Sequence, residues 1–101
     1  MTIQIGSYAF DGPHPNAGQL AARSGVYAIL GRHAPGATWL VLDIGESQDV
    51  RGRIDSHDRR PQWRRQGMPE LACAAWYCAE PDRMRIEQQL RAQFNPPCGD
   101  R

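Results

Sequence analysis

Three apolar runs constrain the fold of this chain more than any other feature of its sequence. Residues 25–32 read GVYAILGR and residues 39–45 read WLVLDIG, and the HAPGAT segment between them is typical of a turn. Because both runs are mostly apolar rather than alternating, we predict an antiparallel hairpin that is buried on both faces. A third strand is predicted at 71–79, LACAAWYCA, which follows Gly67 and Pro69. A chain of 101 residues has room for one sheet and about two or three covering helices.

Helical signals begin directly after the hairpin. Ser47 is placed to cap a helix in which Val50, Ile54 and His57 fall on one side. Pro61 interrupts this pattern, so the first helix is expected to end before it.

Two further helices and an N-terminal strand complete the predicted domain. A short helix is expected around 62–66 with Trp63 as its packing residue, and a longer helix is expected over 82–94. The apolar stripe of the longer helix is Ile86, Leu90 and Phe94. Residues 2–10 alternate apolar and polar side chains and predict a short strand, which a loop rich in Pro, Gly and Asn follows.

These elements predict an α+β fold. A single domain is expected over residues 1–101, with its core at about 24–99 and an N-terminal strand and loop at 1–23. The sheet should be mainly antiparallel, with three strands, or four if the N-terminal segment joins it, and helices should flank it.

Arginine dominates the basic residues of the chain. The net charge is only +1, but all twelve basic residues are arginine and six of them fall between positions 51 and 65, where there are only two acids. The forked guanidinium group matches the spacing of phosphate oxygens and stays charged at any working pH. The cluster is therefore either a solvated helix face or a phosphate-binding face. The arginines that would bind nucleic acid are Arg51, Arg59, Arg60, Arg64 and Arg65.

Cysteine usage and hydropathy bound the cellular setting. Cys73, Cys78 and Cys98 lack the spacing of zinc ligands, and we expect them to be reduced thiols in a cytoplasmic protein. No apolar run approaches the roughly 20 residues that span a bilayer, and no cleavable signal precedes the first predicted strand. We therefore expect no membrane partner.

Four segments in register resemble the motifs of the GIY-YIG nuclease family. GVY at 25–27 is similar to the first motif, and Gly45 stands where the glycine of the second motif belongs. IEQQLRAQFNPPCG at 86–99 resembles the closing helix and tail. The residues spaced as in the helix of that family are Ser47, Val50, Arg53 and His57. The resemblance covers most of the chain and implies the fold of that family, with metal-dependent hydrolysis of phosphodiester bonds.

The resemblance also implies roles for four residues. Tyr27 would deprotonate or orient the attacking water, and Arg53 would stabilise its phenolate and the pentavalent phosphate. His57 would hydrogen-bond the phosphate or relay a proton, and Glu87 would ligate one Mg²⁺ or Mn²⁺ ion. Each residue also has a purely structural alternative: packing for Tyr27 and His57, and ion pairing for Arg53 and Glu87.

The sequence departs from the family pattern at three positions. Asp43 replaces the tyrosine that opens the second motif, Gly99 falls where the final asparagine is expected, and Glu46 replaces a position that is often basic. Removing one transition-state donor commonly costs on the order of 10² to 10³ in rate. Asp43 could act as a substitute site residue by sharing the metal with Glu87, or it could pair with Arg53 and lock the site.

Two hypotheses from different classes follow. The first is an active, divalent-metal-dependent endonuclease whose substrate is nucleic acid, with DNA expected. The second is a catalytically degenerate relative that binds nucleic acid or a protein partner without cleaving. Because the chain has no zinc finger or helix-turn-helix module, we expect it to have little base specificity or to gain specificity from a protein partner. A homodimer that hides Trp39, Trp63 or Trp76 is left open.

Overall fold

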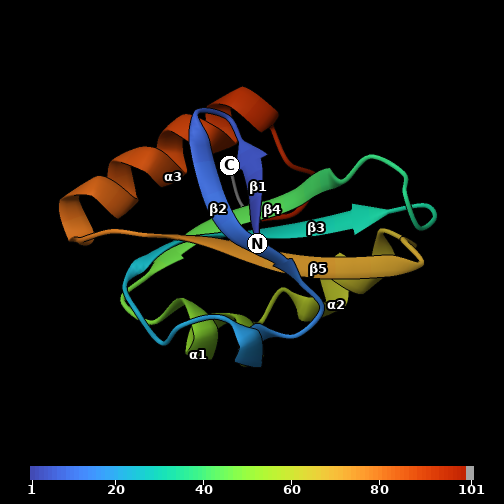
Figure 1. Ribbon diagram of the computed structural model, residues 1–101, viewed down its shortest axis with the longest axis horizontal. Coiled ribbons are helices and arrows are strands. Elements are labelled where there is room, and N and C mark those ends of the chain that lie inside the picture. The colour runs from blue at the N-terminus through green and yellow to red at the C-terminus, as the bar shows by residue number, and fades with distance from the viewer. Residues whose placement is uncertain (100–101) are drawn as a thin grey trace.

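A five-stranded sheet with helices on both faces forms the molecule (Figure 1). The structure is a computed structural model and describes residues 1–99. The strands are β1 (Thr2–Ile5), β2 (Tyr8–His14), β3 (Gly25–Arg32), β4 (Leu40–Ser47) and β5 (Glu70–Tyr77). The helices are the 3₁₀ turn η1 (Ala17–Gln19) and the α-helices α1 (Val50–Asp55), α2 (Arg60–Arg65) and α3 (Glu80–Phe94). The order in the sheet is β1-β2-β5-β3-β4 and every pair is antiparallel, which confirms the predicted α+β class.

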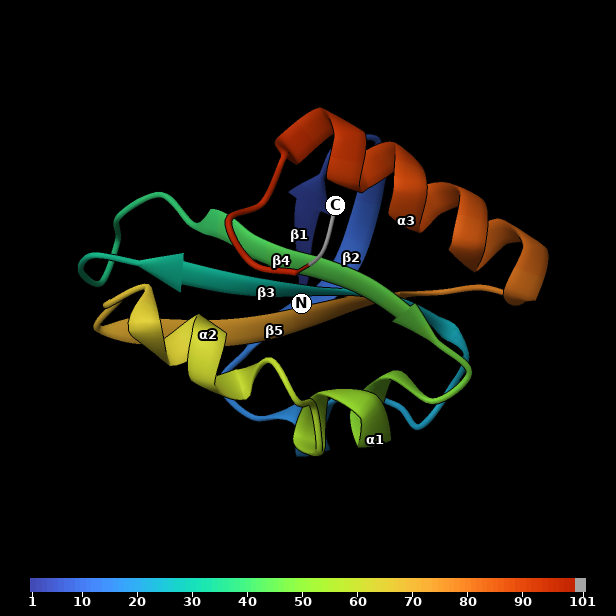
Figure 2. The same ribbon diagram turned by 180° about the vertical axis from the view of Figure 1, so that it is seen from behind.

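β3 lies between β5 and the edge strand β4 and is buried on both faces, as predicted for the hairpin, whereas β4 is buried only in its central part. Val26 and Ala28 face α3, where Ile86 and Leu90 pack against them. The alternate residues of β3 face α1 and α2 on the other side of the sheet (Figure 2). The residues that meet on that second face include Tyr27, Ile29, Val50, Ile54 and Trp63.

The N-terminal segment differs from the prediction, because it forms two strands rather than one strand and a loop. β1 and β2 make a hairpin, and β2 continues to His14, where it pairs with β5. Gly12 and Pro13 suggested a loop, but they lie where the register between β2 and β5 shifts. Gly12 has φ +142, and a Cβ there would come within 2.8 Å of the Cys73 carbonyl oxygen. The glycine thus permits a close strand contact rather than ending the strand.

The helix boundaries also differ from the prediction by a few residues. Asp49, not Ser47, is the N-cap of α1, and its carboxylate accepts from the Gly52 N–H at 3.0 Å. α1 ends at Asp55, so His57 lies just beyond the helix. Pro61 lies in the first turn of α2, where its missing N–H costs nothing, so this helix begins before the predicted residue 62.

The long helix α3 begins two residues before the predicted position. Ile86 and Leu90 are buried, but Phe94, the third member of the predicted stripe, is 37% exposed. Asn95 ends the helix in the left-handed conformation with φ 45. No helix within residues 1–99 is long and apolar enough to cross a bilayer.

The three cysteines are free thiols, as predicted. Cys73 and Cys98 are buried and Cys78 is half-buried. Burial raises the pKa of the Cys73 thiol to about 11, which keeps it protonated and unreactive at neutral pH.

The tryptophans are packed within the chain. Trp63 is buried against α1 and the sheet. The Arg32 guanidinium lies over Trp39, with its Cζ atom 4.3 Å from the centroid of the indole ring. Trp76 packs against the Tyr8 ring.

Candidate functional site

The phenol of Tyr27 lies across Gly45, its direct partner on the neighbouring strand. A Cβ on residue 45 would come within 2.2 Å of the Tyr27 hydroxyl oxygen, so only glycine leaves room for the ring. Tyr27 itself is 2% exposed. The first and second motifs of the sequence therefore form one physical unit, a tyrosine ring and the glycine that admits it.

His57 holds the hydroxyl group of Tyr27. The His57 Nε2 atom is 2.6 Å from the Tyr27 oxygen, and the His57 Nδ1 atom accepts from the Arg59 N–H at 3.0 Å. The neutral ring therefore carries its proton on Nε2 and donates to the phenol. The exposed Asp58 carboxylate lies 3.1 Å from the same Nδ1, which can donate to it only when the ring is protonated.

The buried pair is electrically neutral at pH 7. Burial, assisted by the charges of Arg53 and Arg59, lowers the pKa of His57 to about 4. Burial also raises the pKa of Tyr27 to about 12, because it outweighs the opposing charges of these two arginines, and Asp43 raises it further. The tyrosine is thus a neutral hydroxyl unless a further cation approaches it.

Arg53 connects this buried pair to the surface. Its charge lies close enough to lower the pKa of the Tyr27 phenol, although burial dominates that pKa. Its side chain is 41% exposed, and its Nη2 atom lies 3.4 Å from an Asp58 oxygen, a long and weak ion pair. A phosphate at the surface could therefore contact Arg53 directly above the tyrosine.

Asp43 is the centre of a buried ion cluster. Its side chain is fully buried, and its Oδ2 atom accepts from Arg59 Nε and from Trp63 Nε1, each at 2.7 Å. Its Oδ1 atom accepts from Arg91 Nη1 at 2.9 Å. Two guanidinium groups and an indole N–H thus satisfy both oxygens, which is what a buried carboxylate requires.

The segment that follows α3, residues 95–99, returns along the edge strand β4 (Figure 2) and contacts this cluster. Arg91 Nη2 donates to the Cys98 carbonyl at 2.8 Å, and the Cys98 N–H donates to the Leu42 carbonyl at 3.0 Å. A Cβ on Gly99 would come within 2.7 Å of Arg91 Nη2 and 3.0 Å of Asp43 Oδ1. The glycine that stands in place of the expected asparagine therefore lies against the ion cluster, where a side chain would meet the Arg91 guanidinium and the Asp43 carboxylate.

The acids near the site have partners that the sequence did not identify. Asp43 pairs neither with Arg53 nor with a metal shared with Glu87, because arginine and tryptophan donors occupy both of its oxygens. Glu46 accepts from Arg83 Nε at 2.6 Å, so an arginine of α3 compensates the charge that is reversed relative to the family pattern.

Glu87 lies on the face of α3 that also carries Arg83 and Arg91. Arg83, one turn earlier, and Arg91, one turn later, both reach residues 43–46 of that strand. Side chains at i and i+4 share one helix face, so Glu87 lies between these two contacts and is half-buried there. This face of α3 therefore lies beside the edge strand β4, but α3 covers the face of the sheet opposite to Tyr27, which lies on the side of α1 and α2.

The donor set limits what kind of metal ion the site could hold. Residues 1–99 contain no group of three or more His, Cys, Asp or Glu side chains placed to bind a metal. Mg²⁺ is commonly held by one or two carboxylates, with waters and substrate phosphates completing its shell. Glu87 therefore fits a hydrated ion that binds together with a phosphate. The His, Cys, Asp and Glu residues within 1–99 do not form a site in which protein ligands alone would surround the ion.

The predicted nucleic-acid-binding arginines divide into two groups. Arg51, Arg64 and Arg65 are exposed on α1 and α2. Arg59 is committed to Asp43, and Arg60 donates to the carbonyl groups of residues 54 and 55 at 3.2 and 3.3 Å. The positive surface on this face is thus smaller than the sequence suggested.

Sequence reasoning missed Trp63, Arg59 and Arg91 as partners of Asp43. The sequence predicted Trp63 as a packing residue and Arg59 as a nucleic-acid-binding residue, and it suggested only Arg53 or a shared metal as partners of Asp43. A signal was present, because a carboxylate at the end of an apolar strand must find donors if it is buried.

Comparisons of this chain with family models, with curated proteins and with solved structures find no match. The resemblance to GIY-YIG nucleases therefore stays a prediction from the motifs, and the functional argument rests on the geometry of the site.

The unusual pKa of His57 predicts a pH-dependent stability. The folded protein keeps the ring neutral down to a pKa of about 4, whereas the unfolded chain protonates it near 6.5. The unfolded state therefore binds the proton first, and stability is lost as pH falls below about 6.5. Between pH 7.5 and 5.0 we expect a loss of about 2 kcal/mol in the free energy of unfolding, measured by urea denaturation.

His57→Gln should flatten this pH dependence, while the same substitution at the exposed His33 should leave it unchanged. A wild-type stability that stays constant over this pH range would contradict the assigned environment of His57.

Proposed function

We propose that this chain is a divalent-metal-dependent endonuclease that hydrolyses phosphodiester bonds in nucleic acid, with DNA as the expected substrate. The observation that supports it most is the hydrogen bond of 2.6 Å between Tyr27 and His57 beneath the half-exposed Arg53. Glu87 lies on α3, on the opposite face of the sheet, between Arg83 and Arg91, which both reach the edge strand β4. The free cysteines fit a cytoplasmic setting.

Each residue has a defined part in the proposed reaction. The Arg53 fork binds the phosphate and stabilises the negative charge that develops on it. Tyr27, with a pKa of about 12, acts as a neutral hydroxyl that orients the attacking water, and His57 fixes the direction of that hydroxyl. Glu87 would hold Mg²⁺ or Mn²⁺, which when bound supplies Lewis-acid stabilisation of the leaving oxygen.

Cleavage of plasmid and single-stranded DNA tests the proposal. We expect cutting with Mn²⁺ or Mg²⁺ and none with a chelator. Glu87→Gln and Arg53→Ala should each lower the rate by about 100-fold, since each removes a group that stabilises the transition state. Glu80→Gln, a matched change at an exposed position of the same helix, should cut at the wild-type rate.

Metal binding provides a second readout that does not depend on cutting. Mn²⁺ should raise the DNA affinity of the wild type more than that of Glu87→Gln. No cleavage under any of these conditions, or full activity in Glu87→Gln, would refute the proposal.

The alternative function, binding without cleavage, is favoured by two observations. Tyr27 is almost sealed from solvent, and the residue that replaces the second-motif tyrosine, Asp43, is occupied by ion pairs. A domain of this kind could retain the exposed arginines Arg51, Arg64 and Arg65 for phosphate contacts.

Salt dependence tests the binding surface under either function. Affinity for DNA should fall steeply with salt, and replacing Arg51, Arg64 and Arg65 with glutamine should reduce the log–log slope by about 2 to 3. Arg85→Gln, an exposed arginine on α3, is the control and should leave the slope unchanged. Binding that is insensitive to salt would point to a protein partner instead.

A further inference from the structure

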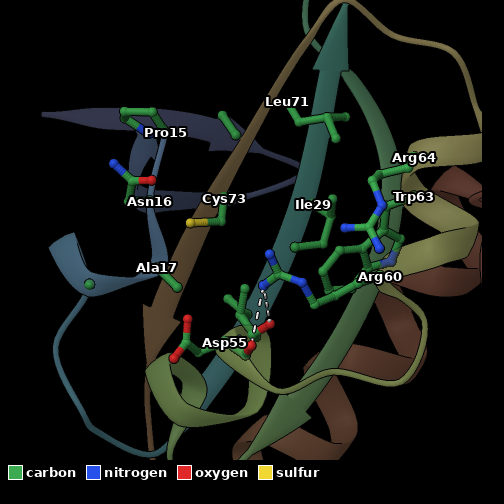
Figure 3. A pocket seen from close by; sticks show the side chains of 13 residues that line it. Pro15, Asn16, Ala17, Ile29, Asp55, Arg60, Trp63, Arg64, Leu71 and Cys73 are labelled. Carbon is green, nitrogen blue, oxygen red and sulfur yellow. Dashed lines mark hydrogen bonds between the residues drawn. The ribbon is translucent and has the colours of Figure 1, made fainter.

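A pocket of about 200 Å³ opens between α2 and the segment before and within η1 (Figure 3). Its floor and inner wall are apolar side chains of both sheet and helices: Ile29, Ile54, Trp63, Leu71 and Cys73. This volume is smaller than the roughly 300–1,000 Å³ of drug-sized sites, and an apolar cavity of about 150 Å³ suffices for a benzene ring. The pocket is therefore sized for one planar ring system.

The rim of the pocket is polar and mainly cationic. Arg60 and Arg64 stand on one side of the mouth and Asn16 on the other, with Asp55 as the single acid (Figure 3). Hydrogen bonds from Arg60 to two carbonyl groups hold its guanidinium in place. Two arginines against one carboxylate favour a ligand that carries a negative charge next to its ring.

Trp63 joins the pocket to the candidate site. Its indole lines the pocket, its ring lies 4.9 Å from the His57 ring, and its N–H donates to Asp43. The contacts with His57 and Asp43 fix the position of the indole, and a group in the pocket lies one side chain away from His57.

The chemistry that fits is a base together with its phosphate. The ring would enter the apolar floor beside Trp63, the Asn16 amide can pair with a base edge, and the arginines bind the phosphate. We infer that the pocket receives one unpaired base of the strand bound at the Tyr27–Arg53–His57 site, so that the substrate is single-stranded or locally unpaired nucleic acid. This inference rests on the proposed function. A base stacked in a duplex cannot enter the pocket without leaving the helix.

Binding in the presence of a chelator tests this inference without cleavage. A labelled single-stranded oligonucleotide should bind about tenfold more tightly than a blunt duplex of equal length, because only the former can place a base in the pocket. A strand made of abasic units should lose this advantage. Equal affinity for all three ligands would overturn the inference while leaving the nuclease proposal standing.

Two variants assign the effect to the pocket. Arg64→Gln should weaken single-strand binding about tenfold more than Arg65→Gln, because Arg64 lines the pocket and its neighbour Arg65 does not. Leu71→Phe should fill the half-buried floor and remove the single-strand preference, while far-ultraviolet circular dichroism shows that the fold is kept. Equal effects of the two arginine variants would overturn the inference.

A free mononucleotide is the other possible source of the same chemistry. Adenosine 5′-monophosphate and thymidine 5′-monophosphate, followed through the Trp63 indole N–H signal in NMR spectra, should bind far more weakly than the oligonucleotide. Tight mononucleotide binding without oligonucleotide binding would overturn the inference and the nuclease proposal together.

Discussion

Asp43→Ala is expected to lower the free energy of unfolding by about 3–5 kcal/mol, the largest effect of any single substitution considered for this protein. The change removes the acceptor for Arg59, Arg91 and the Trp63 N–H at once. Arg91 is itself buried, so its charge cannot be rehydrated without opening the chain. The lost stability comes mainly from the buried donors that are left without an acceptor. Their desolvation costs more free energy than the ion pairs contribute to the stability of the wild type.

Urea denaturation at pH 7.5 measures this effect. Asp82→Ala removes an exposed carboxylate that pairs with Arg85, and it should change stability by no more than about 0.5 kcal/mol. Asp43→Asn keeps the shape and one acceptor oxygen, so we expect a loss between those of the two alanine variants. An Asp43→Ala protein as stable as the wild type would show that the cluster does not hold the tail and α3 to β4.

Measuring cleavage activity beside stability for Asp43→Asn separates a structural from a catalytic role for Asp43. If this residue were a metal ligand, Asp43→Asn would abolish activity and leave stability nearly unchanged. The hydrogen bonds predict the reverse order, with stability falling first and activity falling only as the fold is lost.

The hairpin and the core of the candidate site were predictable from sequence because their signals are local. The two apolar runs at 25–32 and 39–45 are joined by a short turn, and such a pair has few alternatives to an antiparallel hairpin. Tyr27 and Gly45 face each other as a result of that pairing. His57, in contrast, lies two residues beyond α1, and its hydrogen bond to Tyr27, 30 residues earlier in the chain, was not predicted.

The ion cluster and the N-terminal strands were not predictable because their determinants are distant or ambiguous. The partners of Asp43 are 16, 20 and 48 residues away in the sequence, and no local pattern links them. Gly12 and Pro13 are typical loop residues, yet glycine is also found where two strands approach so closely that a side chain would clash, as at Gly12. The register shift that explains both residues depends on β5, which lies some sixty residues later in the chain.

Gly45→Ala is the second change with a large expected effect, a loss of about 3 kcal/mol or more in the free energy of unfolding. The added Cβ would lie 2.2 Å from the Tyr27 hydroxyl oxygen, 2.3 Å from Cζ and 2.7 Å from Cε2. These are atoms of a rigid, buried ring rather than the end of a flexible side chain. The ring must therefore leave its place, and the bond to His57 breaks with it.

Gly18→Ala is the matched control, since a Cβ there meets nothing within 4 Å, and it should change stability by no more than about 0.5 kcal/mol. Tyr27→Leu in the Gly45→Ala background should cost less than the sum of the two single changes, because removing the ring removes the clash. Additive costs would mean that the ring does not lie over Gly45. In that case, the paired motifs would not form the floor beneath Arg53 on which the proposed hydrolysis depends.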